Sequence, residues 1–171
     1  MSPRHARQGV SLFERYSTAS RLVIFSARAE AGNVGSGFID TEHILLGVLR
    51  VDPKTLQLTA QPLSLHSVRN YAIRWHTPSE KLGSSLDLPI SQDAVLVLDK
   101  AVSLADGHGC DFVRTEHLLL ALTAITTSHA AAILQEAGIS LGRLEEIVDA
   151  LPRTEQQEGN PSSIEDLLPE L

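Results

Sequence analysis

The sequence is short of aromatic residues, cysteines and long apolar runs. Aromatic side chains make up 4% of the 171 residues, so a core must be built from Leu, Val, Ile and Ala, which suits packed helices. The single cysteine, Cys110, excludes an internal disulfide and fits a reducing compartment. No apolar run approaches membrane-spanning length, and the polar start lacks the apolar segment of a secretory signal. We therefore expect a cytoplasmic protein that is not inserted in a membrane, either a monomer or a weak oligomer.

Basic residues are also in deficit. The chain has 14 Lys and Arg against 21 Asp and Glu, a net charge of −7. Residues 1–80 carry nine basic against six acidic groups, and residues 81–171 carry five against fifteen. A nucleic-acid binder needs a basic face to neutralise phosphates, so we expect no nucleic-acid partner. These 171 residues also lack the Gly-x-x-x-x-Gly-Lys-Ser/Thr loop of an ATPase.

One hexapeptide is written twice. Thr-Glu-His-Ile-Leu-Leu at 41–46 returns as Thr-Glu-His-Leu-Leu-Leu at 115–120, 74 positions later. Laying residues 16–49 on residues 90–123 gives twelve identities in 34 positions without a gap. A repeat of this length indicates a duplicated packing unit, in which each half covers the apolar face of the other.

Apolar residues at helical spacing predict an all-α fold of two four-helix units and no sheet. The first unit, 16–76, has predicted helices at 17–31, from 41 to Asp52-Pro53, at 54–60 and at 64–75. The second, 90–151, has predicted helices starting at 91, at 115–125, at 128–137 and at 140–151. Residues 77–89 are the predicted linker and 1–15 a flexible arm. Residues 152–171 form an acidic tail that we expect to be disordered, although Ile164, Leu167 and Leu168 could form a short docking helix.

Helix ends are marked by capping residues. Ser17 and Thr41 are predicted N-caps, Ser91 is the predicted start of the equivalent helix in the second unit, and Glu42 lies in a first turn, where the helix dipole favours an anion. The glycine-rich segment 32–37 and Gly138 are predicted to end helices. Phe38 and Ile39 are expected to pack the first of these loops against the core.

The duplicated Thr-Glu-His motif, each copy preceded by a helix and a loop, resembles the Clp N-terminal repeat domain over residues 13–151. The likeness is strongest to the N-domains of ClpC-type AAA+ unfoldases. The resemblance implies one pseudo-twofold bundle of eight helices without catalytic activity or cofactor. It also implies partners, namely a Clp unfoldase or protease, or its substrates and adaptors. Without an ATPase module, the expected protein is a free-standing accessory subunit.

In ClpC-type members each repeat can bind a phosphorylated arginine through the glutamate of Thr-Glu-His and the start of the first helix. Carried over by position, the resemblance nominates Glu42 with Ser17, and Glu116 with Ser91. Arg21 remains as a helpful basic residue in the first repeat, whereas Asp93 in the second would repel a phosphate. The expectation is therefore that Glu42→Ala abolishes such binding and that Glu116→Ala matters less.

Other interpretations stay open. Glu42 and Glu116 are either ligand carboxylates or first-turn residues that complement the dipole. His43 and His117 are expected to pack and hydrogen-bond locally rather than to bind metal, because position i+4 holds Gly47 and Ala121. Cys110 is expected to be an inert loop thiol, and Trp75 to cover the edge of the core. The rival functions are a structural accessory of a protease ring with vestigial pockets, and a small hydrolase.

Overall fold

The described residues are all helical apart from turns and two isolated bridges. The computed structural model describes residues 13–57, 63–75 and 87–150. Its helices are α1 (Thr18–Asn33), α2 (Thr41–Val51), α3 (Pro53–Gln57), α4 (Leu65–Trp75), α5 (Gln92–Gly107), α6 (Thr115–Ala124), α7 (His129–Glu136) and α8 (Leu141–Ala150). Seven of these have eight residues or more, and α3 is a short segment of five. The prediction of an all-α fold is confirmed.

Helices α1 and α5 begin and end in the same way. The hydroxyl of Ser17 accepts a hydrogen bond from the amide of Ser20 at 3.2 Å, and that of Ser91 from the amide of Ala94 at 3.1 Å. The predicted N-cap at Ser17 and the predicted helix start at Ser91 are confirmed. Each helix is followed by a glycine with positive φ, Gly35 at 72° and Gly109 at 67°. That conformation is costly for residues with a Cβ and closes the helix end.

Helix α2 begins one residue earlier than the predicted N-cap at Thr41 implies. Thr41 is the first helical residue, and Asp40 is the N-cap, its carboxylate accepting the Thr41 amide at 2.8 Å. The N-cap prediction for Thr41 is therefore wrong. The reason is His43, whose Nδ1 accepts the Asp40 amide at 2.9 Å and so places the cap three residues before the imidazole.

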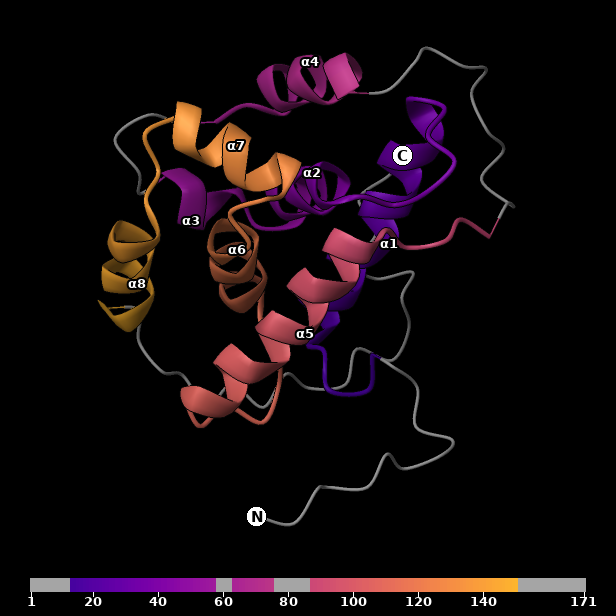
Figure 1. Ribbon diagram of the computed structural model, residues 1–171. Coiled ribbons are helices and arrows are strands. Elements are labelled where there is room, and N and C mark those ends of the chain that lie inside the picture. The colour runs from indigo at the N-terminus through magenta and orange to yellow at the C-terminus, as the bar shows by residue number, and fades with distance from the viewer. Residues whose placement is uncertain (1–12, 58–62, 76–86, 151–171) are drawn as a thin grey trace.

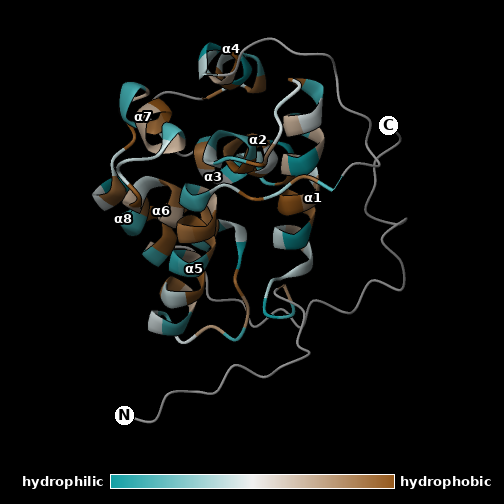
Figure 2. Cartoon of the chain, turned by 45° about the vertical axis from the view of Figure 1, so that its right-hand side comes forward, coloured by the Kyte–Doolittle hydropathy of each residue, from teal (hydrophilic) through white to brown (hydrophobic). Residues whose placement is uncertain are grey.

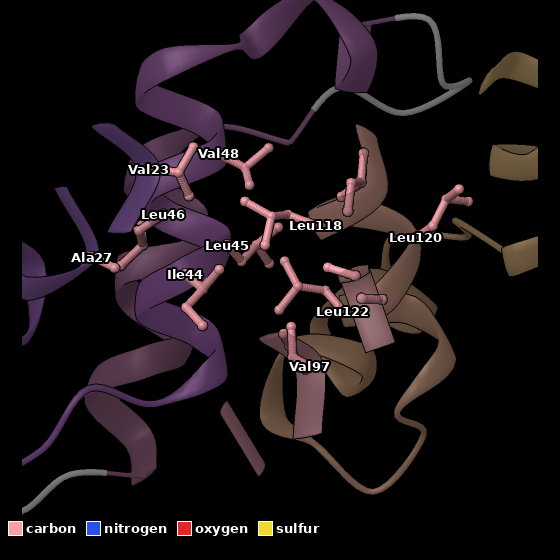
Figure 3. Close-up of a cluster of buried hydrophobic side chains, with 14 of the residues drawn as sticks. Val23, Ala27, Ile44, Leu45, Leu46, Val48, Val97, Leu118, Leu120 and Leu122 are labelled. Atoms are coloured by element: carbon pink, nitrogen blue, oxygen red, sulfur yellow. The ribbon is translucent and has the colours of Figure 1, made fainter. Parts of the chain in front are cut away.

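The two Thr-Glu-His helices, α2 and α6, lie at the centre of the molecule, with the other helices around them (Figure 1). In Figure 2 the helices turn their hydrophobic sides inward and their hydrophilic sides outward. Figure 3 shows side chains of α1, α2, α5 and α6 meeting in one buried cluster. Its fully buried members include Leu45, Leu46, Leu118 and Leu122. The core is thus aliphatic, as the scarcity of aromatic residues requires.

Helices α1 and α2 approach closely at Gly47. A Cβ placed on Gly47 would lie against the backbone carbonyl of Val23, well inside contact distance. In the second half the equivalent residue is Ala121, which is buried. The glycine in the first copy of the motif is therefore required by packing.

Backbone hydrogen bonds join the two halves at the starts of their helices. The segment before α1 pairs with the segment before α6, and the segment before α2 pairs with the segment before α5. Residues 15–17 bridge to Val113: the Ser17 amide donates to the Val113 carbonyl at 2.9 Å, and the Val113 amide to the Arg15 carbonyl at 2.8 Å. Ile39 makes the equivalent bridge, donating to Pro89 at 2.8 Å and accepting from Ser91 at 2.9 Å. Each half therefore starts its first helix against the loop of the other half.

Several smaller predictions can be compared with the structure. Ile39 is buried as expected, but Phe38 is 40% exposed, so that part of the prediction is wrong. Gly138 follows α7 with a φ of 73°, which confirms the predicted helix end. The arm up to residue 12, the end of the third predicted helix, most of the linker and the acidic tail lie outside the described residues.

Among the described residues no single helix is long and apolar enough to cross a membrane. The bent pair α6 and α7, which meet at 92°, passes the same test of length and composition when the two are taken together.

Candidate functional site

The structure forms two sites at the starts of the Thr-Glu-His helices. We call the first the α2 site and define it by Asp40, Glu42, Ser91 and His129. We call the second the α6 site and define it by Ser17, Arg21, Arg114 and Glu116.

The bridges pair these residues differently from the sequence prediction. Ser17 lies beside Val113, next to the start of α6, and the Ser91 hydroxyl donates to Asp40 Oδ1 at 2.8 Å, at the start of α2. The predicted pairs, Glu42 with Ser17 and Glu116 with Ser91, are therefore wrong. The repeat alignment relates equivalent residues, whereas the neighbours come from opposite halves.

The α2 site is buried and acidic. Glu42 is fully buried and Asp40 is 8% exposed. His129, the first residue of α7, places Nδ1 3.2 Å from Glu42 Oε2 and 3.6 Å from Asp40 Oδ2. Asp93, in the first turn of α5, adds a further acid near Ser91. With no exposed surface, the Glu42 carboxylate is poorly placed to receive a side chain from another protein.

Neighbouring groups hold His129 in place. The Thr41 hydroxyl accepts the Ala130 amide at 3.2 Å, which ties the start of α7 to the start of α2. The Trp75 ring lies parallel to the His129 imidazole, with centroids 4.4 Å apart and planes 1° apart. Trp75, expected to cover the edge of the core, is 39% exposed and stacks on this site instead.

The α6 site is more open. Glu116 is half-buried, and its Oε2 accepts the Thr115 hydroxyl at 3.2 Å. The same hydroxyl lies 2.6 Å from Asp52 Oδ2, at the end of α2. Glu116 is thus partly exposed to solvent, while the buried Ser17 caps α1.

Three arginines lie on or next to the segments that start α1 and α6. Arg15 reaches the carboxylate of Asp106 at 2.8 Å and the carbonyls of Cys110 and Asp111 at 3.4 Å. Arg21, exposed on the first turn of α1, donates to the carbonyls of Phe13 and Glu14 at 3.1 and 3.2 Å. Arg114 precedes α6 and is half-buried. The α6 site thus combines the basic groups of these segments with the acids Glu116 and Asp52, whereas Glu42 lies against His129 and near Asp40.

Both histidines of the Thr-Glu-His motifs hydrogen-bond locally to backbone amides, as expected from the sequence. His43 Nδ1 accepts the Asp40 amide, and His117 Nδ1 accepts the Arg114 amide at 3.0 Å. Burial lowers the pKa of His117 to about 4, with smaller contributions from the positive charges of His108 and Arg114. His117 is therefore neutral near pH 7.

Cys110 offers little to support a catalytic role. The thiol is half-buried, and its nearest polar contact is the His108 carbonyl at 3.9 Å. His108 turns toward the His117 ring, with centroids 5.3 Å apart. The cysteine and the neighbouring histidine thus have separate contacts.

Sequence reasoning missed two residues of the α2 site. Asp40 could have been found, because an acid before Thr-x-His at cap spacing is a helix-start signal. His129 could not, because it lies 87 residues from Glu42 and only the packing of α7 on α2 brings them together.

Comparisons with known proteins agree with this arrangement. A model of the Clp repeat (R) N-terminal domain matches residues 15–137 and 89–166. The chain is 26% identical over 151 residues to the chloroplastic chaperone protein ClpD1 of Oryza sativa subsp. japonica. It is 31% identical over 140 residues to a ClpA homolog, the ATP-binding subunit of an ATP-dependent Clp protease, from Cyanidium caldarium. These matches cover 82% and 78% of this chain but 16% of each relative's length.

Solved structures share the fold. The N-terminal domain of ClpD from Arabidopsis thaliana superposes with a TM-score of 0.66 at 21% identity, covering 79% of this chain and 95% of that one. The Hsp104 N-terminal domain from Candida albicans gives 0.60 at 17% identity, covering 80% and 91%.

Proposed function

Because this chain belongs to the Clp repeat (R) N-terminal domain family, we propose that it is a non-catalytic module that binds substrates or adaptors of a Clp ATPase. The support is twofold. The relatives it matches are Clp chaperones and Clp ATP-binding subunits, and its fold is that of their N-terminal domains. The polar residues of both sites also work in helix capping and in contacts between elements, which explains them without a reaction.

The proposal includes an internal duplication. The two halves are two four-helix repeats, 16–76 and 90–151, related by a pseudo-twofold axis. Matching serine caps on α1 and α5, matching positive-φ glycines and the reciprocal bridges support this. The short α3 is the counterpart of α7 in this scheme.

The ligand site that we propose is the α6 site. A phosphorylated arginine carries a guanidinium and a phosphate, and the site offers a partner for each. The half-buried Glu116 carboxylate suits a guanidinium, while the start of α1 at Ser17 and the Arg21 side chain suit a phosphate. This one observation, an accessible acid beside a basic helix start, carries the assignment.

The α2 site is less suited than the α6 site to bind a phosphorylated arginine. Glu42 is fully buried and already lies against His129, and Asp93 occupies the first turn of the neighbouring helix α5. A phosphate there would meet negative charge. The proposed order of importance is therefore the reverse of the sequence expectation, with Glu116 ahead of Glu42.

Calorimetric titration of the protein with an arginine-phosphorylated peptide tests the proposal, with the unphosphorylated and serine-phosphorylated peptides as controls. Glu116→Gln should weaken binding by about tenfold or more, since a charge-assisted pair is lost. Glu145→Gln, an exposed acid on α8, should leave it unchanged. Equal losses for Glu42→Gln and Glu116→Gln would contradict the assignment to the α6 site.

A second experiment addresses the partner. The protein, immobilised, is incubated with a purified Clp ATPase ring and separately with that ring's substrates. Retention of substrates or adaptors supports a recognition module. Retention of the ring alone, undisturbed by Glu116→Gln, would favour a structural accessory.

A further inference from the structure

The α2 site brings two carboxylates and an imidazole close together. The peptide binding proposed for the α6 site does not explain this cluster. Asp40, Glu42 and His129 each offer a ligand atom, and all these atoms lie within 4.8 Å of one another. From this geometry we propose that the α2 site binds one divalent transition-metal ion, Zn²⁺ being the best fit, through these three side chains.

The distances suit a metal. In a tetrahedral site with bonds of about 2.0–2.2 Å, neighbouring donor atoms stand about 3.3–3.6 Å apart. His129 Nδ1 is 3.2 Å from Glu42 Oε2 and 3.6 Å from Asp40 Oδ2. The third spacing, between the two carboxylates, is within 4.8 Å, and three donors leave the fourth tetrahedral position for water. A small adjustment of side chains thus converts the cluster into a coordination sphere.

The net negative charge of the α2 site also favours the binding of a cation. Both carboxylates are buried, and burial of like charges beside each other is costly without compensation. The starts of α2 and α7 each contribute about half a positive charge. Counting these groups alone, about one negative charge remains when His129 is neutral. A divalent ion outweighs that remainder.

The outer contacts orient the ligands. The Ser91 hydroxyl and the Thr41 amide both donate to Asp40 Oδ1, at 2.8 Å each, which turns Oδ2 toward His129. The Trp75 ring fixes the plane of the imidazole, and the Ala130 amide anchors its helix on Thr41. Metal ligands in proteins are commonly held by such a second layer of contacts.

The donor set narrows the choice of ion. One nitrogen and two oxygens suit Zn²⁺ and its transition-metal neighbours, whereas Mg²⁺ and Ca²⁺ favour sites built from oxygen alone. The ion would join α2 of the first half to α7 of the second, with Trp75 of α4 covering it. Its role is structural, because it clamps elements together away from the α6 site.

The test uses the full chain, free of any affinity tag and treated with a chelator. Trp75 is the only tryptophan and stacks on His129, so its fluorescence reports directly on the site. Titration with Zn²⁺ should change the fluorescence with saturation at one ion per chain and should raise the melting temperature. Asp40→Asn keeps a good N-cap residue but removes the charge, and should weaken binding by about tenfold or more.

Matched variants locate the ion. His129→Gln should abolish both responses, whereas His66→Gln, an exposed histidine on α4, and Glu116→Gln at the α6 site should leave them unchanged. Circular dichroism of each variant without metal checks that it is folded. Lack of a saturable response in the folded wild-type protein would overturn the proposal. So would unchanged binding in His129→Gln, or binding of Ca²⁺ or Mg²⁺ in preference to Zn²⁺.

Discussion

The buried imidazole of His117 couples one residue to the pH dependence of the whole fold. Burial holds its pKa at about 4, below the ordinary value of 6.5, so the unfolded chain binds a proton more readily than the folded one. Its contribution to stability is complete above about pH 6.5 and is lost as the pH falls toward 4. Protonation would also remove Nδ1 as the acceptor for the Arg114 amide.

We predict that His117→Gln flattens this part of the pH profile. Glutamine is neutral throughout and can also accept the Arg114 amide from the third helical position. Between pH 7 and 4 the wild type should lose on the order of 2–3 kcal/mol more than the variant. Urea unfolding at several pH values measures the difference. Parallel profiles for the two proteins would show that this imidazole is not the cause.

A second buried residue, Glu30, joins helices through an ion pair. Its carboxylate is 1% exposed on α1 and receives Arg69 of α4 at 2.7 and 3.0 Å, with Arg50 of α2 at 3.4 Å. Removing one partner of a buried carboxylate leaves its desolvation uncompensated. Three helices therefore depend on this one acid.

Arg69→Met is predicted to destabilise the protein by about 1–3 kcal/mol, with the half-exposed position of Arg69 keeping the loss moderate. The matched control is Arg143→Met, which breaks an exposed pair with Glu146 on α8 and should change stability by less than about 0.5 kcal/mol. Chemical denaturation provides the measurement. Equal effects would mean that the Glu30 pair is no stronger than a surface pair.

At the scale of the helix, the contact of α1 with α2 depends on a missing side chain. Gly47→Ala should destabilise by about 1–3 kcal/mol or more, because the new Cβ meets the rigid carbonyl of Val23. Gly142→Ala, in α8 with open space around it, should instead be neutral or stabilise by up to about 1 kcal/mol. A neutral Gly47→Ala would show that the helices can separate at little cost.

Helices and caps followed from local patterns to within a few residues, because spacing and capping act over one or two turns. Ser17 and Ser91 were predictable for that reason. The exception was Thr41, where the imidazole of His43 sets the cap and the hydroxyl does not. The glycine at 47 could be noted from the sequence, but only the packing shows why it is needed.

At the scale of the whole molecule, the site could be predicted only in part. The resemblance nominated Glu116, Ser17 and Arg21 by position within each repeat, which cannot show that the halves exchange neighbours. His129 joined Glu42 through the packing of α7, a contact with no local signal. Residues that occupy equivalent positions in the two halves of the sequence are therefore not the residues that lie next to one another in the fold.

The four backbone hydrogen bonds between halves predict a single cooperative unfolding transition. Calorimetry should give equal calorimetric and van't Hoff enthalpies. In hydrogen exchange, Gly47→Ala in α2 should lower protection in α6 as well as in α1. Two resolved transitions, or a loss confined to the first half, would contradict this.

The reciprocal bridges also bear on how such a chain can change over generations. Each copy of the motif starts its helix against a loop that belongs to the other copy, so neither carries a whole site by itself. A substitution near Ser17 therefore affects Val113 at the start of α6, and one near Ser91 affects Asp40 at the start of α2. Each Thr-Glu-His helix therefore depends on the sequence of both halves, because its start is built partly from the other half of the chain.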